Sequence, residues 1–292
     1  MRRKRIDSKN IFIGILAFLV IVQAFFLFAH KPQKQVAKKT IEKIVAVKET
    51  SKKQPVVIPM TPKPVVKAIE APLIAVIIDD CGYNLLPCKY SSSIKAPITF
   101  SILPDLMHSV KVAECVHAND KEVMLHLPLE PHEIMEKYPK DYLIKTAMTK
   151  GAIENILRKS LDTIPNLSGV NNHTGSKATE DRRTMSIIFV ILKERGLFFV
   201  DSLVTNHSIC RTLAEEMHLP FSTRNTFLDN ENDRTYIEGQ FAHLADQAKN
   251  QGYAIAIGHA RSLTLQIVKE QTEKLEKEGF QFVTVKELIN RR

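Results

Sequence analysis

Two adjacent aspartates, Asp79 and Asp80, follow six apolar residues in the stretch LIAVIIDDCGYN (73–84). Charged side chains are rarely buried without a partner, so a core-like segment that ends on two carboxylates needs a physical reason. Two explanations are open. Adjacent aspartates can cap the N-terminus of a helix, which involves no chemistry, or they can face a cleft as acid, base or metal ligand.

Four further apolar segments also end in residues that can move protons or bind a metal. These residues are His126 and Glu130 in EVMLHLPLEP, Asn171, Asn172, His173 and Ser176 in GVNNHTGS, Asp201 and Ser202 in GLFFVDS, and His259 in AIAIGH. Each alone is weak evidence, because a polar residue at a strand end is commonly a hydrogen-bonded or turn residue. Five segment ends of this kind together indicate a functional cluster.

The residue types in this cluster point to a metal-dependent hydrolase. Carboxylates and imidazoles together suit Zn²⁺ or a similar first-row divalent ion. Such an ion polarises a carbonyl and lowers the pKa of a bound water, which gives a nucleophile near neutral pH. A carboxylate beside the ion can accept the proton of the water, and a histidine opposite can protonate a leaving amine.

The segments that position these residues alternate between short apolar runs and amphipathic stretches. The expected strands are 73–78, 97–103, 122–126, 168–171, 196–200, 253–258 and 280–284, and the expected helices are 150–164, 183–194, 208–218, 234–250 and 263–278. Continuous apolar runs are typical of strands buried on both faces of a parallel sheet. The pattern predicts an α/β domain over 73–292, either a barrel or a doubly wound sheet, with ligands at the carboxyl ends of its strands.

The N-terminal part has a different composition. Residues 1–10 carry five basic side chains and are expected to be cytoplasmic; residues 11–29 are 19 residues interrupted only by Gln23. That length crosses a bilayer core of about 30 Å and exceeds the usual signal-peptide core of about 7–15 residues. An uncleaved signal anchor is favoured over a cleaved signal peptide. The composition of residues 30–72 predicts a disordered, charged linker. The basic flank predicts a single-pass inner (plasma) membrane protein with a periplasmic, extracytoplasmic domain.

Charge and motif content exclude some function classes. Residues 1–72 hold 15 Lys and Arg against 4 Asp and Glu, whereas residues 73–292 hold 26 against 28. The basic excess therefore belongs to the tail, which argues against nucleic-acid binding. No glycine-rich phosphate loop occurs, which argues against nucleotide use. The four cysteines, Cys81, Cys88, Cys115 and Cys210, allow either disulfides or buried thiols.

Seven segments of the chain resemble, in the same order, those of the divergent polysaccharide deacetylases, a distant branch of the NodB-type carbohydrate deacetylases. The segments are IAVIIDDCGYN, ITFSILP, EVMLHLPLEP, GVNNHTGS, GLFFVDS, TFLDN and AIAIGH. The resemblance covers about 73–288. It implies an irregular (β/α) barrel of about seven units and a metal-dependent hydrolase ancestry.

The resemblance also implies roles for individual residues. Asp79 resembles the general base and His259 the general acid, whereas Asp80, His126 and His173 resemble metal ligands. Further residues are candidates to line the cleft. These are Glu130, Asn172, Ser176, Asp201, Ser202, Arg224 and Asp229.

The chain departs from the pattern of ordinary deacetylases at one metal ligand. Those enzymes carry a second histidine four residues after the first, where this chain has Glu130. Either His173 replaces that histidine, or Glu130 binds the metal, or the metal is held less tightly. In addition, Cys81 separates the aspartate pair from Gly82, and Asn225 stands where the divergent branch usually has aspartate.

The expected function is removal of N-acetyl groups from a polysaccharide or envelope glycan by a membrane-anchored, zinc-dependent hydrolase. Two alternatives remain open at this point. The domain could be a non-catalytic glycan- or peptidoglycan-binding scaffold that retains the fold, or it could hydrolyse a peptide or another amide.

Overall fold

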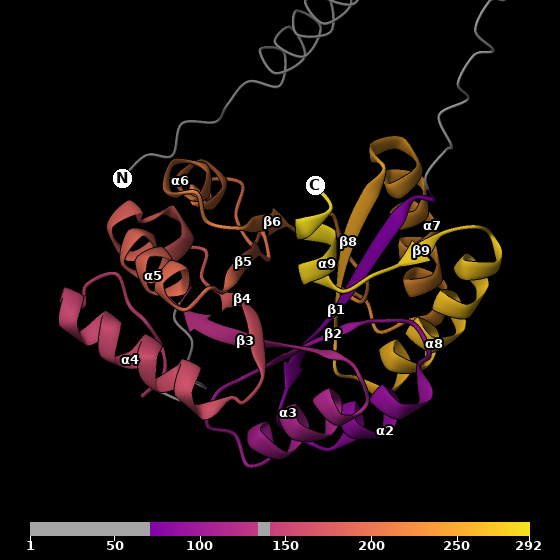
Figure 1. Cartoon of the computed structure of the whole chain (residues 1–292), viewed down its shortest axis with the longest axis horizontal. Coiled ribbons are helices and arrows are strands. Elements are labelled where there is room, and N and C mark those ends of the chain that lie inside the picture. Colours follow the sequence, from indigo (N-terminus) through magenta and orange to yellow (C-terminus); the bar gives the residue numbers. More distant parts are fainter. Residues whose placement is uncertain (1–70, 134–140) are drawn as a thin grey trace, which may run out of the picture. The chain divides into compact units, whose positions relative to one another are not determined.

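The computed structural model describes residues 71–133 and 141–292, and Figure 1 shows their arrangement. The strands are β1 (Leu73–Cys81), β2 (Thr99–Ile102), β3 (Glu122–Leu129), β4 (Leu167–Thr174), β5 (Phe198–Asp201), β6 (Phe221–Thr223), β7 (Thr226–Phe227), β8 (Tyr253–His259) and β9 (Gln281–Phe282). The α-helices are α2 (Leu86–Ser93), α3 (Ser109–Ala118), α4 (Lys150–Thr163), α5 (Arg182–Glu194), α6 (Cys210–Met217), α7 (Arg234–Gln251), α8 (Ser262–Lys277) and α9 (Val285–Asn290), with a 3₁₀ turn at Ala178–Glu180. The predicted N-terminal segments at 1–10 and 11–29 lie outside the described residues, as does almost all of the linker.

The nine strands of this part of the chain form one parallel sheet in the order β6-β5-β4-β3-β2-β1-β8-β7, with β9 paired to β1. Successive strands are neighbours and β1 lies beside β8, which is the strand order of a (β/α) barrel. Over the described ranges β6 pairs with β5 and β7 with β8, and no pairing joins β6 to β7. The barrel is therefore distorted and open at this point. The expected irregular barrel is confirmed, and the doubly wound alternative is excluded by the strand order.

Side chains along each strand alternate between two faces of the curled sheet. One face packs against the surrounding helices and forms the larger apolar core, to which β1 contributes Ile74, Val76 and Ile78. The inner face forms a smaller core that includes Ala75 and Ile77. Helix α9 contributes to this inner core and lies at the amino ends of β1 and β3. The apolar residues therefore fill only one end of the interior.

The inner face becomes polar toward the carboxyl ends of the strands. Asp79 on β1, His126 on β3 and His259 on β8 each follow a member of the inner core by two residues. Because residues two apart in a strand share a face, these side chains line the interior beyond the small core. The alternation of side chains along each strand thus places the predicted acid–base and metal-binding residues on the same face of the sheet.

The sequence-based prediction missed five short elements: β6, β7, α2, α3 and α9. β6 and β7 are three and two residues long, and their pairing with β5 and β8 holds them. Such segments are too short to show a periodic pattern of their own. Helix α2 mixes polar and apolar residues with little contrast and begins beside Pro87. Local sequence carries little signal for elements that tertiary pairing defines.

Cys88 and Cys115 form a disulfide that joins α2 to α3, with Cα atoms 5.6 Å apart, whereas Cys81 and Cys210 are buried free thiols. The pair is 27 residues apart in sequence, so the bond closes a sizeable loop. Replacing both residues (Cys88→Ser with Cys115→Ser) is expected to lower the free energy of unfolding by about 3 kcal/mol, which is a fall in Tm of about 6–12 °C. Thermal unfolding by circular dichroism measures the change. Reductant should produce a similar shift in the wild type and none in the variant; equal stability of the two proteins would contradict the prediction.

Within residues 71–133 and 141–292, no helix combines the length and apolar character needed to cross a bilayer. The predicted span at 11–29 lies before this part of the chain.

Candidate active site

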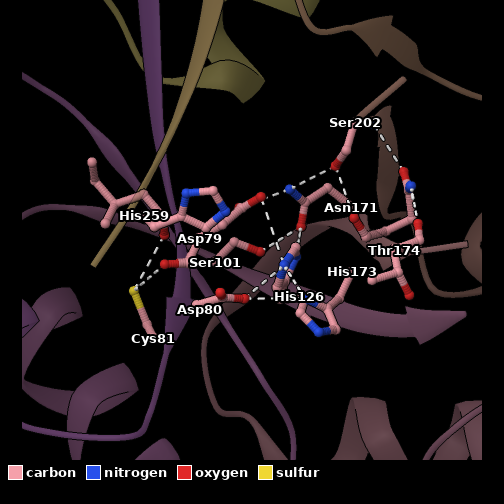
Figure 2. Close-up of polar contacts among 12 residues, drawn as sticks. Asp79, Asp80, Cys81, Ser101, His126, Asn171, His173, Thr174, Ser202 and His259 are labelled. Carbon is pink, nitrogen blue, oxygen red and sulfur yellow. Dashed lines mark hydrogen bonds and ion pairs between the residues drawn. The ribbon is translucent and has the colours of Figure 1, made fainter. Parts of the chain in front are cut away.

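Asp79 and Asp80 reach the same group of polar side chains because β1 is irregular where they occur. In a regular strand, consecutive side chains point to opposite faces. The register against β2 shifts between Ile78 and Cys81, which marks a β-bulge, and Asp80 has a left-handed backbone with φ of 58°. Aspartate adopts this conformation more readily than most residues. The irregularity directs the Asp80 side chain toward the same group of residues as Asp79 (Figure 2).

Asp80, His126 and His173 bring three potential metal ligands together from the carboxyl-terminal halves of β1, β3 and β4. Nε2 of His126 lies 3.3 Å from Oδ1 of Asp80, and Nδ1 of His173 lies 3.0 Å from the same oxygen. The two imidazole nitrogens are 3.0 Å apart. The three ligand atoms lie close together, and Figure 2 shows the three side chains pointing toward one another.

A divalent cation fits this arrangement. Ligand atoms at about 2.0–2.1 Å from a tetrahedral Zn²⁺ lie roughly 3.3 Å from one another, close to the spacing seen here. Oδ1 of Asp80 is buried and forms no hydrogen bond of good geometry with the described residues, despite its two imidazole neighbours. A buried oxygen in that state is costly unless another group satisfies it. Two imidazoles and a carboxylate form a donor set that suits Zn²⁺ or a similar ion.

Asn171 on β4 connects the metal-ligand cluster to Asp79 (Figure 2). Its Nδ2 donates to Oδ1 of Asp79 at 2.8 Å. Its Oδ1 accepts from the hydroxyl of Ser101 at 2.6 Å and lies 2.7 Å from Nδ1 of His126. Asn171 is fully buried and precedes His173 by two residues, so both side chains lie on the same face of β4.

Burial and charge give the two aspartates different acidities. Burial raises the pKa of Asp79 above its usual range, although the charge of His126 and the hydrogen bond from Asn171 act in the opposite direction. Burial acts in the same way on Asp80, but the neighbouring imidazoles of His126 and His173 outweigh it and hold the pKa of Asp80 well below its usual range. Asp80 is therefore ionised at neutral pH, as a metal ligand requires, and Asp79 is the better proton acceptor.

His259 ends β8 beside Asp79, and Asp229 holds its ring. Nδ1 of His259 lies 2.8 Å from Oδ1 of Asp229, while Oδ2 of Asp229 accepts from the His259 backbone and from the Thr264 hydroxyl. Burial alone would lower the pKa of His259, but the hydrogen bond with Asp229 and the charge of Asp229 outweigh burial, so this pKa is raised. Since Nδ1 is engaged, Nε2 is the ring nitrogen left to exchange a proton.

Phe227 packs beside His259, and Arg224 packs on the Phe227 ring. The Phe227 ring stacks parallel to His259 with centroids 6.1 Å apart, and the Arg224 guanidinium lies 3.9 Å from the centroid of the Phe227 ring. Arg224 also donates to the backbone carbonyls of Ser202 and Leu203. It therefore links the end of β5 to the β7–β8 side across the gap in the sheet.

Glu130 is engaged away from the metal-ligand cluster. Its Oε2 accepts from the backbone nitrogen and the hydroxyl of Thr146, each at 2.7 Å, and its Oε1 accepts from Nζ of Lys177 at 3.0 Å. His173, and not Glu130, joins Asp80 and His126 in the cluster. Of the alternatives left open by the sequence, this geometry favours His173 in place of the missing second histidine.

Glu130→Gln is expected to change the affinity for zinc by less than about threefold and to lower the free energy of unfolding by about 1–2 kcal/mol, since it weakens the contacts with Thr146 and Lys177. A competition titration with a zinc chelator and a thermal melt measure the two effects. His173→Ala is the matched comparison and should weaken zinc binding strongly. A Glu130 variant that loses zinc to the same extent would identify Glu130 as a ligand.

Three polar residues near the strand ends bond mainly to the backbone, although the Ser202 hydroxyl also accepts a 3.4 Å hydrogen bond from Nδ2 of Asn171. Asn172 donates to the Thr174 carbonyl and accepts from the Ser202 nitrogen, and the Ser202 hydroxyl donates to the Asn172 carbonyl. The side-chain oxygen of Asn225 accepts from the Ile255 nitrogen. An uncharged amide is sufficient for that bond, which explains how asparagine can stand where the divergent branch usually has aspartate.

Ser176 and Asp201 stabilise loops at the carboxyl edge of the sheet. The Ser176 hydroxyl accepts from the His132 backbone nitrogen. The Asp201 carboxylate accepts from the Leu203 nitrogen and from the Ser208 hydroxyl, so it forms the Asx-turn contact that is common at strand ends. Among the candidates for the cleft, Asp229 has the most direct contact with a predicted catalytic residue.

The sequence analysis placed Asn171 in the functional cluster but gave it no role, and it did not include Ser101. Ser101 is a polar residue inside the apolar segment ITFSILP, and Asn171 precedes His173 by two residues. Strand periodicity could have placed Asn171 on the same face as His173. The contact between Ser101 and Asn171 joins residues 70 apart, and no local pattern reveals it.

Two curated proteins are similar to this chain in sequence, and one solved structure is similar in fold. The chain is 29% identical over 203 residues to the uncharacterized protein YibQ of Escherichia coli K12, covering 69% of this chain and 63% of that protein. It is 26% identical over 196 residues to an uncharacterized protein of Haemophilus influenzae, covering 67% of this chain and 69% of that protein. The crystal structure of the uncharacterized protein ATU2773 from Agrobacterium tumefaciens C58 has a TM-score of 0.72 at 18% identity, over 75% of this chain and 89% of that one, which shows a shared fold.

The family comparison covers most of the chain. Residues 76–289 match the family described as divergent polysaccharide deacetylase. The matched range includes every residue of the site described above, from Asp79 to His259. The chain belongs to the divergent polysaccharide deacetylase family.

Proposed function

We propose that the protein is a membrane-anchored, extracytoplasmic, metal-dependent hydrolase that removes N-acetyl groups from a polysaccharide or envelope glycan. The main support for this proposal is the convergence of the three potential metal ligands Asp80, His126 and His173. Asp79 and His259 lie beside them but are not part of this ligand set. A non-catalytic scaffold would need a glycan surface, but it would not need a buried carboxylate oxygen facing two imidazoles.

The residues around the cluster can perform the proton transfers of amide hydrolysis. When bound, a divalent ion supplies a Lewis acid for the acetamide carbonyl and for water. Asp79 accepts the proton of the attacking water at Oδ2, because Asn171 occupies Oδ1. His259 donates a proton from Nε2 to the departing amine, and Asp229 holds its ring in place through Nδ1.

The extracytoplasmic location is supported by two independent features. Residues 11–29 have the length and composition of a signal anchor preceded by basic residues. The domain also contains the Cys88–Cys115 disulfide, and disulfides persist mainly in oxidising compartments. A glycan of the cell envelope would be accessible to a domain in that location.

The test uses the full-length chain purified in detergent. Bound metal is quantified by mass spectrometry, and acetate release is measured on N-acetylated glycan oligomers and on acetylated peptides, with and without added zinc. The proposal expects about one metal per chain and acetate release from glycans. A protein that binds these glycans but releases no acetate, even with zinc present, would instead support the scaffold alternative. Acetate release from peptides alone would change the substrate class.

A further inference from the structure

Asn171 makes contacts that a purely structural residue would not need. It is fully buried, and each end of its amide meets a different functional group. Nδ2 donates to Asp79, the proposed base, and Oδ1 faces Nδ1 of His126, a proposed metal ligand. Ser101 donates to the same Oδ1 and holds it in place.

One orientation of the amide satisfies its three shortest contacts, and in that orientation Nδ2 also donates to the Ser202 hydroxyl at 3.4 Å. With Nδ2 toward Asp79, the amide donates to a carboxylate and its oxygen accepts from Ser101. The reverse orientation would place a carbonyl oxygen against the Asp79 carboxylate, where neither group can donate. The hydrogen-bond network therefore fixes which amide atom faces His126.

This orientation determines the tautomer of His126. An amide oxygen can only accept, so Nδ1 of His126 must carry the proton in the 2.7 Å contact. The lone pair of a neutral His126 is then on Nε2, the atom that faces Asp80 and His173. Metal ligation requires this tautomer, and a hydrogen bond to the opposite ring nitrogen commonly selects it.

The same amide also orients Asp79. Its bond to Oδ1 leaves Oδ2 directed at the metal-ligand cluster, 3.7 Å from Nε2 of His126. We propose that Asn171 is a positioning residue that holds His126 in the metal-binding tautomer and Asp79 in the proton-accepting orientation at once. This inference rests on the proposed function. An amide suits both tasks because one planar group contains a donor and an acceptor.

Two substitutions separate the two tasks. Asn171→Ala removes both contacts and is expected to weaken zinc binding by about 10–100-fold. Asn171→Asp keeps an acceptor for His126 but loses the donor to Asp79 and places a like charge beside it. This variant is expected to keep zinc affinity within about threefold of the wild type while kcat falls about 100-fold, since base catalysis contributes about 10²–10⁴-fold. Asn119→Ala is the control, because its amide also donates two hydrogen bonds, to Ser91 and Cys115, at the end of α3.

The measurements use the full-length chain in detergent and Zn²⁺ as the probe. Chelator competition gives the zinc affinity, and ¹⁵N-histidine spectra of the zinc-loaded protein report the Nδ1 proton of His126. This proton should be hydrogen-bonded and slow to exchange in the wild type and in Asn171→Asp, and it should exchange rapidly in Asn171→Ala. Lower stability would speed the exchange of buried protons throughout the domain, whereas loss of this contact speeds the exchange of the His126 proton alone. Thermal melts confirm that each variant is folded.

The outcomes distinguish this inference from the proposed function. Unchanged zinc affinity and an unchanged His126 proton in Asn171→Ala would overturn the inference. A zinc-binding wild type that deacetylates no substrate would overturn the deacetylase function, while the effects of Asn171→Ala on zinc would still support the positioning of His126. A wild type that binds no zinc would overturn both.

Discussion

Asp79→Asn is expected to abolish acetate release while the chain keeps its zinc, whereas Asp80→Asn is expected to lose the zinc as well. The two residues are adjacent, but only Asp80 has a carboxylate oxygen within 3.0–3.3 Å of both imidazole nitrogens of the cluster. An amide in place of the Asp79 carboxylate could still pack in the same space but would accept protons poorly, so kcat should fall by about 10³–10⁴-fold. Loss of the ligand in Asp80→Asn should weaken zinc binding by more than about 100-fold, which exceeds the usual effect of a residue that only supports a ligand.

Chelator competition and acetate release, measured side by side on both variants, test this division of roles. Asp201→Asn is the control, because Asp201 is another buried aspartate at a strand end whose carboxylate bonds to Leu203 and Ser208 instead of the cluster. Its zinc affinity should match that of the wild type. Equal loss of zinc in the Asp79 and Asp80 variants would mean that both aspartates bind the metal and that another group acts as the base.

Much of the fold could be predicted because continuous apolar runs indicate strands that are buried on both faces of a parallel sheet. The run LIAVII before Asp79 contributes alternate residues to the outer and the inner core, so both faces had to be apolar. The same periodicity explains why the strand-end residues meet. The carboxyl ends of neighbouring parallel strands lie at one edge, and β1, β3, β4 and β8 each place a functional group there.

The sequence could not show which polar residues pair with each other. The family resemblance left both His173 and Glu130 open as metal ligands. The difference lies in Thr146 and Lys177, which form hydrogen bonds with Glu130. Those contacts depend on how the segment after β3 packs against the segment after β4. The Asp80 bulge was hidden for a related reason, because it is defined by the register against β2 and by a left-handed φ value.

The two proposed proton-transfer residues, Asp79 and His259, have hydrogen-bond partners of different charge. Asp79 is bonded to the neutral amide of Asn171, whereas His259 is bonded to the carboxylate of Asp229. A base should lose its proton readily and an acid should retain one near the working pH. The neutral partner leaves Asp79 free to accept a proton, and the charged partner favours the protonated form of His259. The hydrogen bond between His259 and Asp229 therefore predicts how the pH–rate profile changes when the charge of Asp229 is removed.

Asp229→Asn is expected to move the alkaline limb of the pH–rate profile to lower pH. Burial lowers the pKa of His259, and the hydrogen bond with Asp229 and its charge raise it above the usual value in the wild type. Without that charge the pKa falls, so the acid form of His259 is lost at a lower pH and the rate declines earlier as pH rises. His259→Ala should lower kcat by about 10²–10⁴-fold with zinc affinity unchanged, since His259 lies outside the ligand cluster.

Acetate release measured across pH for the wild type, Asp229→Asn and Asp201→Asn checks this prediction. Asp201→Asn removes a buried charge that contacts no imidazole among the described residues, so its alkaline limb should coincide with that of the wild type. A limb that moves to higher pH, or does not move at all, would mean that the protonated form of His259 is not the acid, and the leaving amine would then have to receive its proton from Asp79 after the attack on the carbonyl.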